Sequence, residues 1–148
     1  MDNKVILLVD DSRNDVFLAQ RALKKGNIAN EVVTAEEGAD ALDYLFGKGK
    51  YAGRDTSRMP VVVLLDLKMP KLDGLEVLQR MRASPLTKLL PVVILTASKE
   101  ESDILKSYKL GCNAFVRKPV DFDQFVEAVK QLGLFWLVLN EAPPAVRD

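Results

Sequence analysis

The chain has 148 residues, a length that suits one domain with a single core, and its apolar fraction of 48% is ordinary for a globular protein. Lysine plus arginine and aspartate plus glutamate both number 21, so the formal net charge is zero, which argues against a nucleic-acid partner. The chain contains no histidine, which excludes a histidine base, nucleophile or metal ligand within it. The single cysteine, Cys112, excludes an internal disulfide and fits a reducing compartment.

The N-terminal segment carries no membrane signal. Residues 1–4 lead into the short apolar run 5–9, which is followed at once by two acids. This run is too short for a signal-peptide core or a membrane span. We therefore expect a soluble, cytoplasmic protein with no membrane partner.

Strand-like and helix-like segments alternate along the whole chain. Short apolar runs predict strands over 5–9, 31–34, 61–65, 91–95 and 114–117. Helical spacing of apolar residues predicts helices over 12–26, 36–46, 75–82 and 99–110, and a last helix capped by Asp121. This alternation predicts an α/β fold with a five-stranded, doubly wound parallel sheet covered by helices on both faces.

The domain organisation follows from the same pattern. We expect one domain over residues 1–139, with a polar insertion loop at 47–60 and an extension of the last helix at 132–139. Residues 140–148, which include two adjacent prolines, are expected to form a flexible tail.

Polar residues follow four of the predicted strands at the point where each strand ends. Asp10 and Asp11 follow the first strand, Asp66 follows the third, Thr96 the fourth, and Lys118 the fifth. The carboxyl ends of parallel strands share one edge of the sheet, where open α/β folds place their chemistry. A lone aspartate after a strand is more often a turn residue or an N-cap, so the hypothesis of a site depends on the coincidence of all four strand ends.

This set of residues suits phosphoryl transfer. Neighbouring carboxylates stay ionised together only beside a cation, and Mg²⁺ suits a site with few carboxylates and several waters. A metal ion, the Lys118 ammonium and the Thr96 hydroxyl could stabilise a phosphoryl group in transfer. Asp66 stands alone on its strand, so we expect it to be the nucleophile, whereas Asp10 and Asp11 come as a pair fit to hold the ion.

At these residues the chain resembles the receiver domain of bacterial two-component response regulators, over about residues 4 to 132. The matching segments are Val9-Asp10-Asp11-Ser12, Leu65 to Gly74, Leu95-Thr96-Ala97 and Val116-Arg117-Lys118-Pro119. The resemblance implies a flavodoxin-like, receiver-type fold. It also implies that Asp66 receives phosphate from a histidine of a sensor kinase, which agrees with the lack of histidine here.

The resemblance assigns further roles. Asp11, Asp66 and the backbone carbonyl of Lys68 would bind Mg²⁺, with Asp10 acting through water. Thr96 and Lys118 would contact the phosphoryl group. Phe115 matches the aromatic residue that turns inward in the family as the threonine shifts toward the phosphate. The family often has tyrosine there, so this chain keeps the ring without the hydroxyl.

The insertion and the C-terminal segment are similar to those of the small regulators paired with cyanobacterial and bacterial phytochromes. This similarity favours a phytochrome, such as a bacteriophytochrome, as the sensor kinase. Residues 132–139 are apolar on every side except at Gly133, more than a helix on one domain needs. We expect a homodimer through this helix, with Leu132, Phe135, Trp136 and Leu139 at the interface. The alternative is that the segment folds back onto its own domain.

Two other functions remain open from the sequence. An aspartyl-phosphate phosphatase also uses a strand-end aspartate, Mg²⁺ and lysine, but it requires an Asp-x-Asp motif, and Asp66 is followed by Leu67 and Lys68. A phosphate-independent interaction module could keep the acids for structural reasons. A dinucleotide-binding fold is disfavoured because no Gly-x-Gly-x-x-Gly follows the first strand.

Overall fold

A computed structural model describes residues 5–26, 28, 30–118 and 122–133. The strands form one parallel sheet in the order β2-β1-β3-β4-β5. The strands are β1 (Ile6–Val9), β2 (Val32–Ala35), β3 (Val62–Leu65), β4 (Val92–Thr96) and β5 (Ala114–Arg117). The helices are α1 (Arg13–Lys25), α2 (Gly38–Phe46), α3 (Gly74–Ala83), α4 (Glu101–Lys109) and α5 (Phe122–Gly133), with a short 3₁₀ helix, η1 (Gly49–Tyr51), after α2. The predicted five-stranded, doubly wound fold is confirmed.

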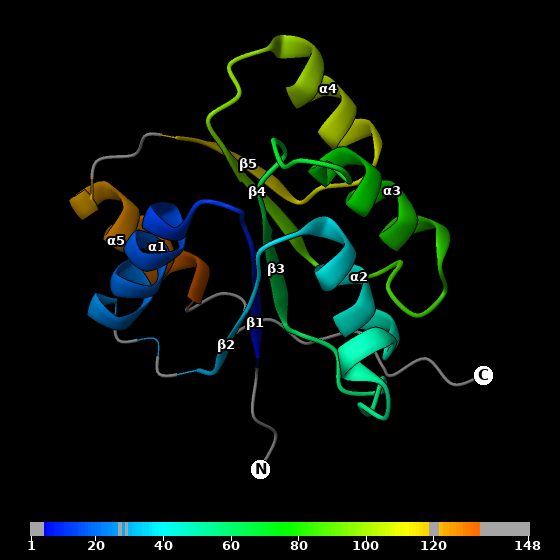
Figure 1. Ribbon diagram of the computed structural model, residues 1–148. Helices are drawn as coiled ribbons and strands as arrows, with labels where there is room; N and C mark the ends of the chain where they lie inside the picture. The colour runs from blue at the N-terminus through cyan, green and yellow to red at the C-terminus, as the bar shows by residue number, and fades with distance from the viewer. Residues whose placement is uncertain (1–4, 27, 29, 119–121, 134–148) are drawn as a thin grey trace.

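The sheet separates two hydrophobic cores (Figure 1). Helices α1 and α5 cover one face, and α2, α3 and α4 cover the other. Successive residues of β3 point to opposite faces, so that Val62 and Leu64 belong to the first core and Val63 and Leu65 to the second. Each such side chain contributes about 1.5–3 kcal/mol when fully buried. Burial on both faces explains why the central strands are unbroken apolar runs.

Two helices begin later than the sequence predicted. Helix α2 was expected from residue 36, but Glu37 stays extended and the helix begins at Gly38. Helix α4 was expected from residue 99, but the Ser98 hydroxyl accepts a hydrogen bond from the Glu100 backbone N–H, so the turn before the helix continues to that residue. The predicted cap of the last helix, Asp121, lies outside the described residues.

The strand order places the candidate site. Strand β1 has β2 on one side and β3 on the other. The connection from β1 therefore leads to one side of β1, and the connection from β2 leads back across to the other side. In open α/β sheets ligands bind outside the carboxyl ends of the strands at such a switch point. Asp10 and Asp11 follow β1 and Asp66 follows β3, so all three lie at this point.

Candidate functional site

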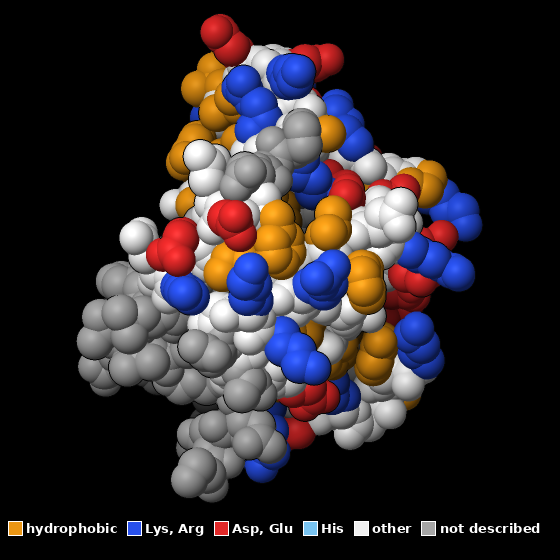
Figure 2. Space-filling view, turned by 90° about the vertical axis from the view of Figure 1, so that its left-hand side faces the viewer, with side chains coloured by type: hydrophobic (Ala, Val, Ile, Leu, Met, Phe, Trp, Pro, Cys, Tyr) orange, Lys and Arg blue, Asp and Glu red, His pale blue; other side chains and the backbone are white. Residues whose placement is uncertain are grey.

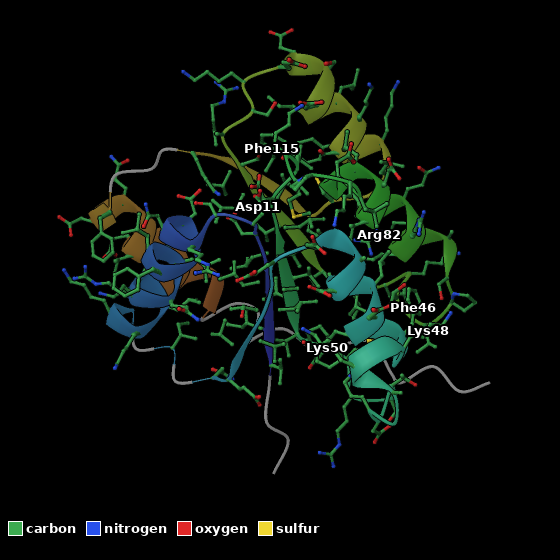
Figure 3. The ribbon with its side chains drawn as sticks, viewed as in Figure 1. Asp11, Phe46, Lys48, Lys50, Arg82 and Phe115 are labelled. Carbon is green, nitrogen blue, oxygen red and sulfur yellow. The ribbon has the colours of Figure 1, made fainter. Side chains whose placement is uncertain are left out.

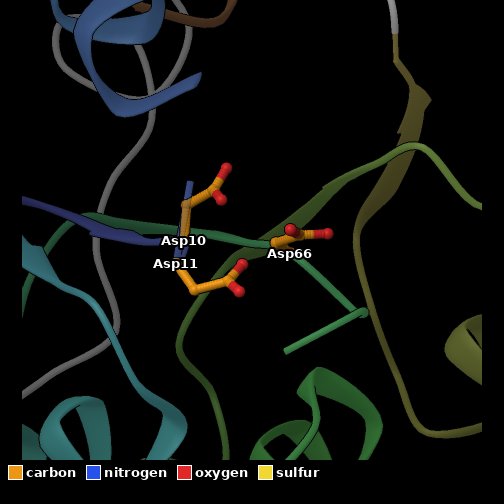
Figure 4. A group of neighbouring side chains, drawn as sticks. All are labelled: Asp10, Asp11 and Asp66. Carbon is orange, nitrogen blue, oxygen red and sulfur yellow. The ribbon is translucent and has the colours of Figure 1, made fainter. Parts of the chain in front are cut away.

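Three carboxylates meet at the ends of β1 and β3 (Figure 4). Asp10, Asp11 and Asp66 each offer an oxygen, and these oxygens lie within 4.8 Å of one another. Asp10 and Asp66 are buried, whereas Asp11 is exposed. Negative charges this close repel one another, and hard oxygen ligands suit a small divalent cation. The donor set therefore fits a metal ion, as the sequence predicted.

The environment of Asp66 disfavours its charged form. Burial raises the pKa of Asp66 above its ordinary value, and the negative charge of Asp10 acts in the same direction. The Lys118 ammonium, a hydrogen bond from Thr96 and the Lys68 backbone N–H, which lies 3.3 Å from Oδ1, oppose this shift without cancelling it. A cation bound beside Asp66 would relieve both burial and repulsion.

Lys118 lies among three acidic residues of the site. Its Nζ is 2.6 Å from Asp10 Oδ2, 2.8 Å from Asp15 Oδ2 and 3.8 Å from Asp66 Oδ2. Burial alone would lower the pKa of Lys118, but the hydrogen bonds to Asp10 and Asp15 raise it above its ordinary value. The ammonium is therefore a fixed positive charge that lies closer to Asp10 than to Asp66.

Asp15 is a site residue that the sequence analysis missed. It lies in the first turn of α1, where its backbone N–H donates to the Ser12 side chain that caps the helix. The sequence did contain a signal for it. Ser12 caps α1 and Asp15 follows three residues later, a pattern that places the acid in the first turn of the helix, near the end of β1. Its pairing with Lys118, across 103 positions of sequence, had no signal of its own.

Thr96 lies on β4, the strand next to β3, and Phe115 lies on β5, one strand further from Asp66. Thr96 is fully buried at the end of β4, at the edge where the carboxylates meet. Phe115 is on β5 beside Ile94, is half-buried, and packs against the core under α2, α3 and α4. The two residues therefore lie on adjacent strands, as the family resemblance requires, while the switching role stays a prediction.

The loop after Asp66 is shaped by close backbone packing. Gly74 donates its N–H to the Leu67 carbonyl, and a Cβ on Gly74 would lie 2.2 Å from the Asp66 carbonyl oxygen. Asp73 caps α3 by accepting from the Glu76 N–H at 3.0 Å. Only glycine fits where the helix begins against the backbone of the candidate nucleophile.

The insertion loop is anchored far from the carboxylates. Lys48 and Lys50 lie at the end of α2 away from Asp11 (Figure 3). Arg54 belongs to this polar loop, yet its guanidinium carbon lies 4.1 Å from the centroid of the Tyr44 ring, and its Nε donates to the Tyr44 carbonyl at 2.6 Å. It also donates to the carbonyl of Leu45, so it satisfies orphan acceptors at the C-terminus of α2.

The predicted dimer interface lies mostly outside the described residues. Leu132 belongs to α5, but its side chain is not described, and Phe135, Trp136 and Leu139 fall beyond the described part of the helix. On the described face of α1 and α5, exposed hydrophobic side chains lie beside lysine and arginine (Figure 2). No described helix is both long enough and apolar enough to cross a membrane.

The chain matches a known protein family over most of its length. The model of the response regulator receiver domain matches residues 6–130. The response regulator Rcp1 of Synechocystis sp. is 38% identical over 142 residues, covering 96% of this chain and 95% of that protein. A structure of its Mn²⁺-bound form has a TM-score of 0.82 and is 37% identical, covering 95% and 99% of the two chains.

Two further solved structures are similar. The phosphorylated cyanobacterial phytochrome response regulator RcpA is 39% identical with a TM-score of 0.84, covering 95% of this chain and 99% of that chain. The bacteriophytochrome response regulator RtBRR is 53% identical with a TM-score of 0.78, covering 95% and 84% of the two chains.

Proposed function

This chain belongs to the response regulator receiver domain family and works in phosphorelay signalling, and we propose that it does so by accepting a phosphoryl group on Asp66. Members of this family are signalling proteins that act with sensor kinases and are not classical enzymes. In the proposed step an Asp66 carboxylate oxygen attacks the phosphorus of a phosphohistidine on the kinase. The new P–O bond forms as the P–N bond breaks, and the bonding electrons leave with the imidazole.

The observation that carries this proposal is the position of Asp66 between a cluster of acids and a fixed ammonium. Its oxygen lies 3.8 Å from Lys118 Nζ, and its neighbours Asp10 and Asp11 complete a set of oxygens within 4.8 Å. We assign Mg²⁺ to Asp11, Asp66 and the Lys68 carbonyl, with Asp10 acting through water. The ion would neutralise charge on the phosphoryl oxygens.

The remaining groups stabilise the transferred phosphoryl group. Thr96 would donate its hydroxyl to a phosphoryl oxygen, and Lys118 would supply positive charge as it moves from Asp10. Phe115 would then turn inward as Thr96 shifts. Release of the phosphate by water, also Mg²⁺-dependent, is part of the proposal and is the only turnover that we expect.

The partner that we propose is a phytochrome-type sensor histidine kinase, such as a bacteriophytochrome. The support is that relatives covering nearly all of this chain are named as response regulators of phytochromes. We propose that residues 1–139 form the receiver domain and that it is a cytoplasmic homodimer through Leu132, Phe135, Trp136 and Leu139. A Trp136→Ala variant that sediments like the wild type would count against this interface. We expect no nucleic-acid partner.

The test of the central proposal is phosphorylation by acetyl phosphate in the presence of Mg²⁺, followed on a phosphate-retarding gel. Wild-type protein should shift, whereas Asp66→Asn should not. Equal modification of both proteins, or of neither, would overturn the assignment of Asp66. No observation favours the phosphatase alternative, and turnover of an external phosphate ester would be needed to support it.

A further inference from the structure

Asp103 is a buried carboxylate that the proposed function does not use. Among the residues that the structure describes, three acids are buried: Asp10, Asp66 and Asp103. Asp103 lies in the first turn of α4, where the helix N-terminus favours a negative charge. Its Oδ2 accepts from the Ser98 hydroxyl at 2.5 Å and lies 3.1 Å from Lys68 Nζ. These two hydrogen bonds, that of Ser98 above all, hold the pKa of Asp103 below its ordinary value.

The two partners of Asp103 also touch the proposed phosphoryl site through their main chains. Lys68 donates its backbone N–H to Asp66 Oδ1 at 3.3 Å. Ser98 donates its backbone N–H to Thr96 Oγ1 at 3.4 Å. Thr96 in turn acts on the Asp66 carboxylate by lowering its pKa, so Asp66, Lys68, Asp103, Ser98 and Thr96 form a ring of interactions that begins and ends at Asp66.

The ring connects α4 to both loops that carry the site. Lys68 is in the loop after β3 and Ser98 is in the loop after β4. The side chain of each residue contacts Asp103. The backbone N–H of Lys68 donates to Asp66, and that of Ser98 donates to Thr96. The Lys68 side chain is 60% exposed, so its ion pair alone would be weak. The Asp103 carboxylate, however, is buried, and a buried charge without hydrogen-bond or charge partners would be costly.

We propose that Asp103 is a positioning residue for phosphoryl transfer to Asp66, because it fixes the Lys68 carbonyl and the Thr96 hydroxyl through the side chains of Lys68 and Ser98. This inference rests on the proposed function. A site of this kind needs its groups held within about 0.5 Å, and supporting residues of metal sites typically change affinity or activity by about 10–100-fold when removed.

The test is Asp103→Asn in the full chain, with Glu101→Gln as the matched control. Glu101 is an exposed acid of the same helical turn, so the control removes the same charge. Titration calorimetry with Mg²⁺ alone should give an affinity about tenfold lower for Asp103→Asn and near that of the wild type for Glu101→Gln. The rate of phosphorylation by acetyl phosphate at saturating Mg²⁺ should fall by a similar factor.

Variants of Lys68 decide whether Asp103 acts through the ring. Lys68→Met should reproduce the loss of Mg²⁺ affinity, whereas Lys68→Arg, which keeps a cation for Asp103, should restore most of it. The double variant Lys68→Met/Asp103→Asn should be no worse than either single variant, because both break one chain of contacts. Should Asp103→Asn fail to fold, the comparison of Lys68→Met with Lys68→Arg decides the question alone.

Several outcomes would overturn the inference. It is wrong if Asp103→Asn behaves like Glu101→Gln in both measurements, if Lys68→Met binds Mg²⁺ as the wild type does, or if losses in the double variant multiply. Phosphate uptake by Asp66→Asn equal to that of the wild type would overturn the proposed function instead, and the Mg²⁺ titrations would still decide the role of Asp103. A wild type that binds no Mg²⁺ would overturn both.

Discussion

The Lys118 ammonium lies 2.8 Å from Asp15 Oδ2, a full 1.0 Å closer than the 3.8 Å that separates it from Asp66 Oδ2. Together with Asp10, at 2.6 Å, Asp15 draws this charge toward the start of α1. A phosphoryl group on Asp66 must therefore compete with two carboxylates for Lys118. This competition sets how much of the lysine's charge is available to the proposed reaction.

Asp15→Asn should increase the rate of phosphorylation by acetyl phosphate, because it removes one competitor for Lys118. The Asp15 side chain is 38% exposed, so its pair with Lys118 is screened by water and is worth at most about 1 kcal/mol. The increase should therefore stay below about fivefold. The measurement is the initial rate on a phosphate-retarding gel.

Glu127→Gln is the matched control for this change, since it removes an exposed acid of α5 that pairs only three residues away, with Lys130. Its rate should equal that of the wild type. A slower rate in Asp15→Asn would mean that Asp15 orients Lys118 for the reaction and does not compete for it.

Lys118→Met should bind Mg²⁺ more tightly than the wild type while being less stable without metal. The substitution removes a positive charge from beside three clustered acids, so a divalent cation gains attraction, by roughly three- to tenfold in affinity. Breaking a buried ion pair typically costs about 3–5 kcal/mol, and the Lys118 side chain is only 13% exposed.

Calorimetry with Mg²⁺ and thermal unfolding in EDTA would measure these two effects, with Lys130→Met as the control. Weaker Mg²⁺ binding in Lys118→Met would contradict a competition between the ammonium and the metal ion. Phosphorylation should be slower in this variant whatever its metal affinity, because the phosphoryl group loses its ammonium.

Asp66→Asn should unfold a few degrees above the wild type at neutral pH in EDTA. Burial raises the pKa of Asp66 in the folded protein, so its ionisation destabilises the fold, and this loss accumulates as pH rises from the unfolded pKa through the folded pKa. Below the unfolded pKa both states hold the proton, and the difference from asparagine should vanish. Melting temperatures across pH would check this, and a constant difference would refute it.

The sequence was informative about the strands and about the polar residues at their carboxyl ends, because burial on both faces demands unbroken apolar runs. The pattern alone thus assigned Asp10, Asp11, Asp66, Thr96 and Lys118 to one edge of the sheet. The helix starts were predicted less accurately, since they depend on side chains such as that of Ser98, which hydrogen-bonds Asp103 and the Glu100 N–H.

Contacts between long side chains could not be predicted in the same way. The Lys68 ammonium bonds Asp103, 35 positions away, and Arg54 folds back on Tyr44. In each case a flexible side chain chooses among several partners of suitable charge, and only the packing of the folded chain decides which one lies within reach.

Gly74→Ala should destabilise the protein by more than about 3 kcal/mol, beyond the usual range for one substitution, and abolish phosphorylation. The new Cβ would lie 2.2 Å from the Asp66 carbonyl oxygen and 2.7 Å from Leu67 Cα, both backbone atoms of the loop that positions the site. The comparison is Gly53→Ala, where no atom lies within 4 Å but φ is +92°. That control should lose only about 1 kcal/mol, the cost of a left-handed conformation. Equal losses in chemical denaturation would contradict the assignment of the difference to close packing.

Arg54→Met should destabilise the protein by about 1.5–3 kcal/mol, because a hydrogen bond from a charged donor contributes about this much to stability. The rate of phosphorylation should not change. The guanidinium donates at 2.6 Å to the Tyr44 carbonyl and at 2.8 Å to that of Arg58, and so ties the insertion to the end of α2. A lysine ammonium cannot donate in the forked geometry of the guanidinium, so Arg54→Lys should recover little of the lost stability.

Lys48→Met is the control for Arg54, since Lys48 is a cation of the same insertion and is exposed. Its unfolding free energy should stay within about 0.5 kcal/mol of the wild type. Because this loop lies at the end of α2 away from Asp11, the acetyl phosphate rate should be unchanged in all three variants (Figure 3). A slower rate in Arg54→Met alone would instead connect the insertion to the phosphorylation site through α2, whose first turn packs against Leu72 in the loop after Asp66.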